Sequence, residues 1–115
     1  MIETKDTEQL EVQRIIDNAK KEFKNVYETK IADEIIIWRP LKRKEYKEIM
    51  TSNEDDNLSD RELVYLREEL LAKKVILYPE NVDDIIEDIA GVAEIISSEC
   101  MEKSGFGLDS KTTKL

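Results

Sequence analysis

The residue types that most often perform catalysis are scarce in this sequence. Its 115 residues include no His and a single Cys, Cys100. Without imidazole there is no general base suited to neutral pH, and a zinc site of the usual ligand types is nearly excluded. Cys100 lies on the apolar side of a helical pattern, where a buried and inert thiol is the expected role. No Gly-rich phosphate loop and no nucleophile elbow occurs, so we expect no enzymatic activity, no catalytic residues and no cofactor.

Carboxylates are abundant, and their arrangement carries little chemical information. The chain has 27 Asp and Glu residues, so pairs of the glycosidase type will arise by chance. The densest acidic run lies within residues 52–57, Ser-Asn-Glu-Asp-Asp-Asn. It lacks the central Gly and the twelfth-position Glu of an EF-hand calcium loop. We therefore expect a solvated linker there, and no metal site.

Basic side chains gather in one short stretch after the only Trp. From Arg39 to Lys47 the chain has five basic residues and one acid. One interpretation is a solvated helix face, because Lys and Arg stems often cover apolar surface while their charges stay in water. The other is a partner-binding face, because Trp, Tyr and Arg are over-represented at interface hot spots. Its candidate residues are Trp38, Arg39, Lys42, Arg43, Tyr46 and Lys47.

Composition narrows the class of partner. The net charge of −9 comes from residues 51–115, since residues 1–50 hold equal numbers of acids and bases. An acidic second half argues against nucleic acid as a partner, although the basic stretch can meet an acidic surface, including that of another copy. The single Cys excludes an intrachain disulfide, as expected in a reducing cytosol. No apolar run approaches the length of a membrane span, so we expect no membrane partner.

The first half of the sequence predicts a helix, a hairpin and a second helix. Apolar residues recur at helical spacing from about 8 to 24. Short, branched and aromatic segments then predict a β-hairpin near residues 26–39, with a turn at 32–34. Pro40 removes a backbone donor and ends the second strand, and the basic stretch follows as a helix. A two-stranded hairpin is marginal in water, so it must pack on helices or borrow a strand from a partner.

The second half of the sequence predicts further helices. Ser59 and Glu62 form a capping box, the best-marked helix start in the chain. The residues expected to be buried on this helix are Leu63, Leu66, Leu70 and Leu71. Residues 75–78 can be a last helical turn or a short extended segment, and we favour a helix end or coil over a sheet strand. Asn81 is a candidate cap for the next helix, and Gly105 for the end of the last one.

Together these patterns predict a mainly α protein with a short β-hairpin, an α+β fold in one small domain. Residues 1–7 are expected to form a flexible N-terminus, residues 8–107 the helical domain, and residues 108–115 a disordered tail. The predicted core consists of Ile15, Ile16, Phe23, Ile36, Trp38, Tyr46, Ile49, Leu63, Leu66, Leu70, Ile76, Ile85, Ile89, Ile95, Ile96 and Phe106.

Three segments in this order resemble a known group of viral proteins. They are residues 37–49 (IWRPLKRKEYKEI), residues 75–79 (VILYP) and residues 90–106, with Ala90-Gly91-Val92 and Ser104-Gly105-Phe106. The order is similar to that in small tail-assembly and baseplate-associated proteins of long-tailed bacteriophages, some of them described as tail assembly chaperones. The resemblance covers roughly residues 25–107, with Ile89-Ala90-Gly91 in place of the Pro-Ala-Gly typical of the group.

This resemblance implies a non-enzymatic protein that binds phage tail proteins, such as tape measure, hub or baseplate subunits. It would act in the host cytoplasm during assembly. The alternatives are a structural subunit retained in the virion tail or baseplate, and a small acidic regulatory or inhibitory binding protein. The basic stretch weakens the last alternative, because an acidic mimic of nucleic acid has no use for it. Self-association is a further expectation, through the basic stretch and the acidic half of another copy.

Overall fold

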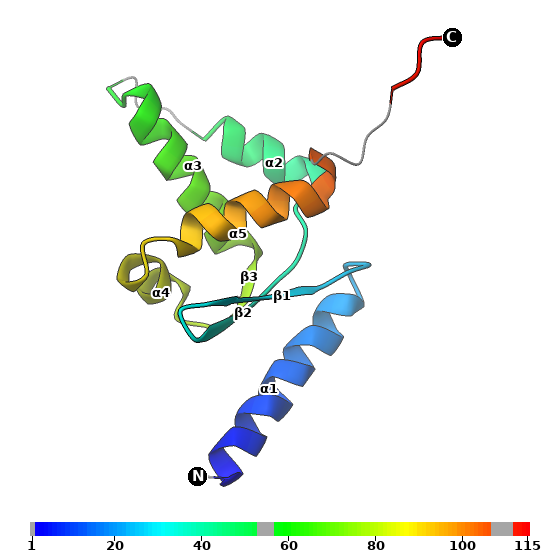
Figure 1. Cartoon of the computed structure of the whole chain (residues 1–115), viewed down its shortest axis with the longest axis vertical. Coiled ribbons are helices and arrows are strands. Elements are labelled where there is room, and N and C mark those ends of the chain that lie inside the picture. The colour runs from blue at the N-terminus through cyan, green and yellow to red at the C-terminus, as the bar shows by residue number, and fades with distance from the viewer. Residues whose placement is uncertain (1, 53–56, 107–111) are drawn as a thin grey trace.

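Helices dominate the described part of the chain, as the sequence predicted (Figure 1). The computed structural model describes residues 2–52, 57–106 and 112–115. A sheet of three antiparallel strands lies between α1 on one side and the other helices on the other. The elements are α1 (Ile2–Lys20), β1 (Tyr27–Ile31), β2 (Glu34–Trp38), α2 (Arg43–Met50), α3 (Asp60–Val75), β3 (Ile76–Tyr78), α4 (Val82–Asp88), α5 (Val92–Met101) and a final kinked helical turn (Glu102–Phe106).

The predicted hairpin is confirmed, and its turn has an unusual composition. β1 and β2 pair in register from Ile31 opposite Glu34 to Tyr27 opposite Trp38, which leaves a two-residue turn. Both turn residues have positive φ, 49° at Ala32 and 68° at Asp33. This is the geometry of the type I′ turn, whose twist matches that of the strands and which favours Asn-Gly. Asp tolerates the left-handed region, whereas Ala32 adopts it at a cost.

The turn therefore leaves room for stabilisation. Replacing Ala32 by Asn and Asp33 by Gly is expected to raise the free energy of unfolding by about 1 kcal/mol, because both new residues accept positive φ. Urea unfolding followed by Trp38 fluorescence measures the change. Ala32→Val is the control and should destabilise, since a β-branched residue is strained at this φ. Equal stability of all three proteins would show that the turn conformation is different.

The third strand corrects the interpretation of residues 75–78 as a helix end or coil. Val75 ends α3, but Ile76–Tyr78 pairs with β2, with Ile37 opposite Tyr78 and Trp38 opposite Ile76. The Arg39 amide donates to the Val75 carbonyl at 3.2 Å beside this pairing. The sequence pattern could not distinguish a helix end from a strand here, because a short apolar run is compatible with both. The hairpin thus completes its sheet with a strand from its own chain.

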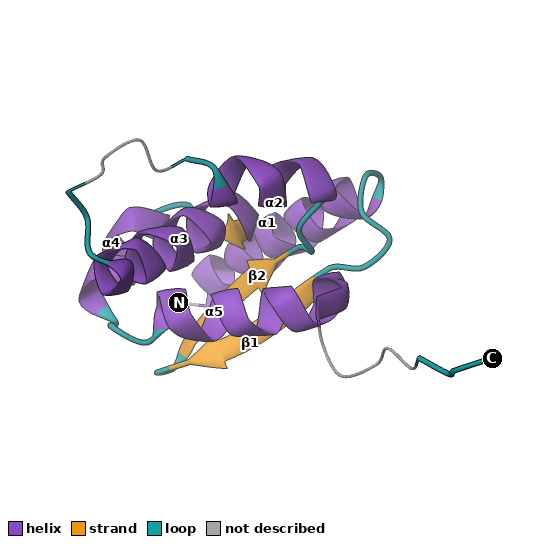
Figure 2. Cartoon of the chain, turned by 90° about the horizontal axis from the view of Figure 1, so that it is seen from above, coloured by secondary structure: helices purple, strands orange, loops and turns teal. Residues whose placement is uncertain are grey.

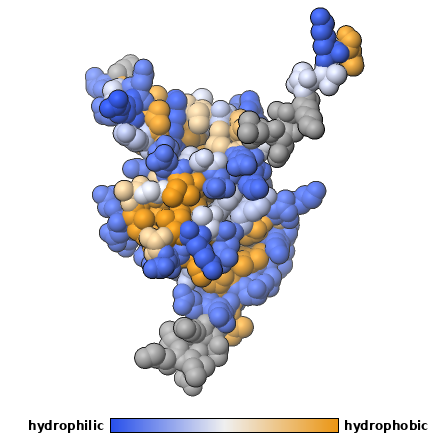
Figure 3. Space-filling model, in the orientation of Figure 1, coloured by the Kyte–Doolittle hydropathy of each residue, from blue (hydrophilic) through white to orange (hydrophobic). Residues whose placement is uncertain are grey.

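The sheet is covered on both faces. Ile36 and Trp38 lie on the face that carries the main core, together with residues of α2 to α5. Ile37 alternates to the opposite face, toward α1, and is also buried. In the space-filling view, hydrophobic residues reach the surface mainly near the middle of the molecule, among hydrophilic ones (Figure 3). The central strand β2 is therefore nearly continuous in hydrophobic residues, as a strand buried on two faces requires.

In the helices, the residues that are buried are not all the ones that the sequence predicted. On α3 the buried residues are Leu71, Ala72 and Val75, whereas Leu63, Leu66 and Leu70 are only half-buried. Among the other predicted core residues, two are exposed, Ile95 by 39% and Phe106 by 48%. Those confirmed as buried are Ile36, Trp38, Ile49, Ile76, Ile85 and Ile96. Those that are half-buried are Ile15, Ile16, Phe23, Tyr46 and Ile89.

The three residues predicted to start or end helices, Ser59, Asn81 and Gly105, have different outcomes in the structure. The predicted capping box is only half formed: the Glu62 amide donates to Ser59 Oγ at 3.1 Å, but the Glu62 carboxylate accepts from the Ser59 hydroxyl rather than from the Ser59 amide. Asn81 precedes α4, but its side chain makes no capping hydrogen bond. Gly105 has a φ of 100°, the left-handed conformation expected of a helix-terminating Gly.

The predicted flexible and disordered segments lie at the two chain termini and in the acidic loop. α1 begins at Ile2, so it includes residues that were expected to form a flexible N-terminus. The acidic loop was predicted at residues 52–57, and residues 53–56 of it lie outside the described part of the chain. The same holds for residues 107–111, and so for much of the predicted C-terminal tail.

Candidate functional site: the basic corner

Trp38, the first residue predicted to contact a partner, lies in the core of the sheet. Only 1% of its surface is exposed. Its ring stacks on Tyr27 with the centroids 4.8 Å apart, and its indole Nε1 donates to Thr29 Oγ1 at 2.8 Å. Both polar and apolar parts of the side chain are therefore satisfied within the chain. The prediction that Trp38 is a surface anchor is therefore wrong, because its side chain lies on the sheet face that packs against the helices.

Arg39, the second predicted anchor, is also buried, with 9% exposure. Its guanidinium donates to both carboxylate oxygens of Glu45, at 2.5 and 2.8 Å, in the bidentate geometry of strong ion pairs. It also donates to the carbonyl of Lys74 at 3.0 Å and lies over the Phe23 ring at 4.6 Å. Arg39 thus ties β2 to α2, to the end of α3 and to the segment after α1. This role is structural, since both terminal nitrogens of the guanidinium donate to groups within the chain.

Glu45 is the acid that makes this arrangement stable. Burial by itself would raise the pKa of Glu45. Hydrogen bonds from Arg39 and from the Lys42 amide, with the charges of Arg39 and Lys74, outweigh burial and hold the pKa below its usual value. The carboxylate therefore stays ionised at neutral pH and serves as the counter-ion of Arg39. In the sequence, the only sign of this pair is the lone acid in a basic stretch.

Lys42 joins the basic stretch to the segment that follows α1. Its ammonium pairs with Glu22 at 2.8 Å and lies 4.8 Å from the centroid of the Phe23 ring. Phe23 therefore contacts two cations, Arg39 and Lys42, which hold the end of the α1 segment against the start of α2. Lys42 remains half-exposed, so its charge is shared between this internal contact and the solvent.

The remaining predicted residues lie together on the exposed side of α2. Arg43 and Lys47 are exposed, and their spacing of four residues places them on one helix face. The Arg43 guanidinium lies 5.4 Å from the centroid of the Tyr46 ring, and Tyr46 packs against Phe106 with the centroids 4.8 Å apart. We call the set of Lys42, Arg43, Tyr46, Lys47 and Phe106 the basic corner.

The final kinked turn, Glu102–Phe106, holds the basic corner in place. The Leu41 amide donates to Ser104 Oγ at 2.8 Å, across a distance of 63 residues in the chain. Leu41, Lys42, Arg43, Tyr46, Ser104 and Phe106 line a shallow hollow at this junction. Phe106 was predicted to be a core residue, and the sequence offered no signal that its ring would join Tyr46 at the surface. The hollow gives the corner an apolar floor with basic groups at its rim.

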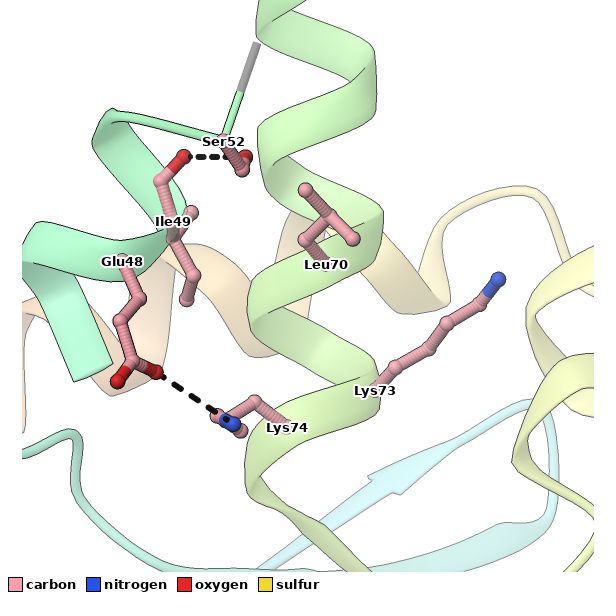
Figure 4. A pocket seen from close by; sticks show the side chains of 6 residues that line it. All are labelled: Glu48, Ile49, Ser52, Leu70, Lys73 and Lys74. Carbon is pink, nitrogen blue, oxygen red and sulfur yellow. Dashed lines mark hydrogen bonds and ion pairs between the residues drawn. The ribbon is translucent and has the colours of Figure 1, made fainter. Parts of the chain in front are cut away.

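A second hollow lies between α2 and α3 (Figure 4). Its lining residues are Glu48, Ile49, Ser52, Leu70, Lys73 and Lys74. Glu48 and Lys74 face each other across it at 3.8 Å, Ser52 donates to the Ile49 carbonyl, and Lys73 points away. The polar groups are thus engaged with one another or directed outward. This groove separates two helices and presents no constellation suited to chemistry.

A third hollow lies between α1 and the hairpin, and its rim is acidic. Glu8, Glu28, Asp33 and Glu34 are among its lining residues. The Tyr78 hydroxyl donates to Glu8 at 2.5 Å. This hydrogen bond, with burial and nearby carboxylates, raises the pKa of Tyr78 to about 12. The phenol therefore stays protonated and acts as a tether between β3 and α1, not as a base.

Cys100 has the inert environment that its position in the sequence predicted. The side chain is fully buried, and its thiol donates to the Arg39 carbonyl at 3.8 Å. Burial raises the pKa of the thiol more than Ser104 and the charge of Arg39 lower it. The neutral thiol is a poor nucleophile. Within residues 2–52, 57–106 and 112–115, no group of three His, Cys, Asp or Glu side chains is arranged to hold a metal ion.

No known relative supports or contradicts the resemblance to phage tail-assembly proteins. Comparison with protein-family models, with curated proteins and with solved structures found no match to this chain. Across the part of the chain that the structure describes, no helix is both long enough and apolar enough to cross a membrane.

Proposed function

We propose that this protein is a non-enzymatic assembly protein of a bacteriophage tail or baseplate, which binds an acidic surface of a tail protein through the basic corner. The observation that carries the proposal is the group formed by exposed Arg43, Lys47 and Phe106 with half-buried Tyr46. Arg and Tyr are enriched at interface hot spots, and a ring that is 48% exposed, as Phe106 is, supplies apolar contact area. The resemblance to tail-assembly proteins supplies the class of partner.

The internal contacts of Arg39 and Lys42 support this choice of surface. Arg39 and Lys42 are occupied by Glu45, Glu22 and Phe23. These contacts fix the start of α2, so that Arg43 and Lys47 are presented on a rigid element. Like charges four residues apart repel modestly, and an acidic partner converts that repulsion into attraction and faster encounter. The proposed partners are tape measure, hub or baseplate subunits.

Charge reversal at the corner tests the proposal. Arg43→Glu combined with Lys47→Glu is expected to slow association with the purified tail protein about tenfold or more at low salt. The loss should shrink as salt rises, because screening weakens exposed charges. Biolayer interferometry over a salt series measures both rates. Phe106→Ala should instead raise mainly the dissociation rate, since it removes contact area without changing charge.

The matched control changes the same charge elsewhere. Arg14 and Lys20 are exposed on α1, so Arg14→Glu with Lys20→Glu alters the net charge equally and should leave association nearly unchanged. Equal slowing of association in both double variants would show an effect of net charge. Unchanged binding of the corner variant would show that Arg43 and Lys47 only form a solvated helix face. Mass spectrometry of purified particles then separates the two versions of the function. Stoichiometric presence would identify a retained virion subunit and exclude a purely transient chaperone.

A further inference from the structure

The outer edge of β1 is the longest unpaired strand edge in the described sheet. The strand order is β1-β2-β3, so β2 is paired on both sides and β1 on one. Among the elements that the structure describes, none is drawn beyond the outer edge of β1 (Figure 2). β3, at the other edge, has only three residues and pairs irregularly. An open edge of five residues is a template for pairing with another strand.

The hairpin register decides which backbone groups face outward from β1. Ile31 and Glu34 close a two-residue turn, and the closing pair of such a turn exchanges hydrogen bonds. Because antiparallel pairs alternate, Tyr27, Thr29 and Ile31 direct their backbone groups toward β2. The N–H and C=O groups of Glu28 and Lys30 therefore point away from the sheet. In the described part of the chain, no other segment bonds to these four groups.

The two outward-facing residues carry opposite charges, which makes the strand complementary to itself. If two copies pair antiparallel with Thr29 on the two-fold axis, Glu28 of each lies opposite Lys30 of the other. Both pairs exchange two backbone hydrogen bonds, and opposite charges at such positions stabilise a sheet. Tyr27 then lies opposite Ile31, an aromatic next to a β-branched residue. Within one chain these charges have no such partner, since Glu28 faces Ile37 and Lys30 faces Ile35.

The charges of Glu28 and Lys30 also disfavour pairing in registers shifted by two residues. A shift of two residues in one direction places Glu28 opposite Glu28, and in the other it places Lys30 opposite Lys30. Like charges directly opposite each other destabilise a sheet. A Lys on an edge strand commonly discourages pairing, but here its charge disfavours only the shifted registers. We propose that a second copy of this chain occupies the β1 edge, forming a symmetric dimer with one continuous sheet of two hairpins and two β3 strands.

This dimer is independent of the basic corner, so the two proposals can fail separately. A pairing through Arg43 and Lys47 with the acidic half of another copy would respond to charge reversal at α2. A pairing through β1 responds to changes at Glu28 and Lys30 and leaves the corner free for another protein. Because the contact is short, the association is expected to be weak and visible only at high protein concentration.

A charge-swap cycle tests the proposed dimer. Glu28→Lys and Lys30→Glu, each alone, place two like-charged pairs in the interface and should weaken dimerisation about tenfold. The double variant, Glu28→Lys with Lys30→Glu, restores opposite pairs and should recover dimerisation to within about twofold of the unchanged protein. Sedimentation equilibrium over a concentration series measures the dissociation constant. Lys24→Glu is the control, because this exposed Lys lies outside β1 and should have no effect.

Amide exchange gives a second, position-specific readout in the full chain. The Glu28 and Lys30 amides should become protected from exchange as concentration rises, whereas the Tyr27, Thr29 and Ile31 amides are already protected at low concentration. Trp38 fluorescence during urea unfolding checks that each variant is folded. A monomer at all concentrations would overturn the proposal. Dimerisation that is unaffected by the single charge reversals would also overturn it, as would a double variant that is folded but monomeric.

Discussion

Glu45→Gln is expected to lower the free energy of unfolding by about 3–5 kcal/mol at neutral pH, because it leaves the buried guanidinium of Arg39 without its counter-ion. Arg39 is 9% exposed and pairs with both carboxylate oxygens of Glu45. Gln has the same shape but offers one acceptor and no charge. Urea unfolding followed by the fluorescence of Trp38, which is buried in the same core, measures the loss.

The control for this prediction lies on the same helix. Glu48 pairs with Lys74 at 3.8 Å, and both side chains are about half-exposed. Glu48→Gln should therefore change the free energy of unfolding by less than about 1 kcal/mol. Similar losses in the two variants would contradict the assignment of a special role to Glu45.

The effect of Glu45 also depends on pH. Its pKa is lowered in the folded protein, so its contribution to stability is fully present above the unfolded pKa and is lost as pH falls through the folded pKa. The difference between the unchanged protein and Glu45→Gln should therefore shrink in acid. Unfolding curves of the two proteins at neutral pH and below the folded pKa of Glu45 measure this. A difference that grows on acidification would mean that the folded pKa is raised.

Leu71→Ala is expected to cost about 2–5 kcal/mol of unfolding free energy, the range for a buried Leu truncated in a packed core. Leu71 is 2% exposed and lies in the core cluster with Ala72 and Val75, against residues of the sheet, α4 and α5. The cavity left by the substitution cannot be filled by neighbours on rigid helices. Thermal and urea unfolding measure the change.

Leu66→Ala is the informative comparison, since the sequence pattern placed Leu66 in the core. The structure leaves it half-buried, so its truncation should cost clearly less than that of Leu71. Val64→Ala, at a side chain 52% exposed, should stay within about 0.5 kcal/mol. Equal costs for Leu66 and Leu71 would show that α3 is rotated relative to the structure described here.

Local signals account for the elements that the sequence predicted well. The hairpin at residues 27–38 follows from a β-branched and aromatic run that ends before Pro40, and the start of α3 follows from Ser59, whose side chain caps the helix. Gly105 takes the positive φ that a helix-terminating Gly accepts without strain. Each of these depends on neighbours within a few residues, which is why a sequence can specify it.

Burial on α3 was harder to predict, because its apolar residues surround the helix. Leu63, Val64, Leu66 and Leu70 offer more than one apolar face. Of the four residues that the sequence pattern placed in the core, Leu71 is buried, whereas Leu63, Leu66 and Leu70 are only half-buried. The face that is buried is the one that α5 and the sheet happen to cover. That choice depends on how the helices pack, and no spacing within α3 encodes it.

The sequence by itself determined the fold class, the hairpin, the main helices and the scarcity of catalytic residue types. Only the tertiary structure decided the roles within the basic stretch, because burial and pairing depend on segments far away in the chain. Residues of α2 to α5 bury Trp38, Lys74 offers its carbonyl to Arg39, and Phe106 meets Tyr46 from the other end of the chain. The six residues predicted as one binding face are therefore divided between a buried ion-pair network and an exposed corner.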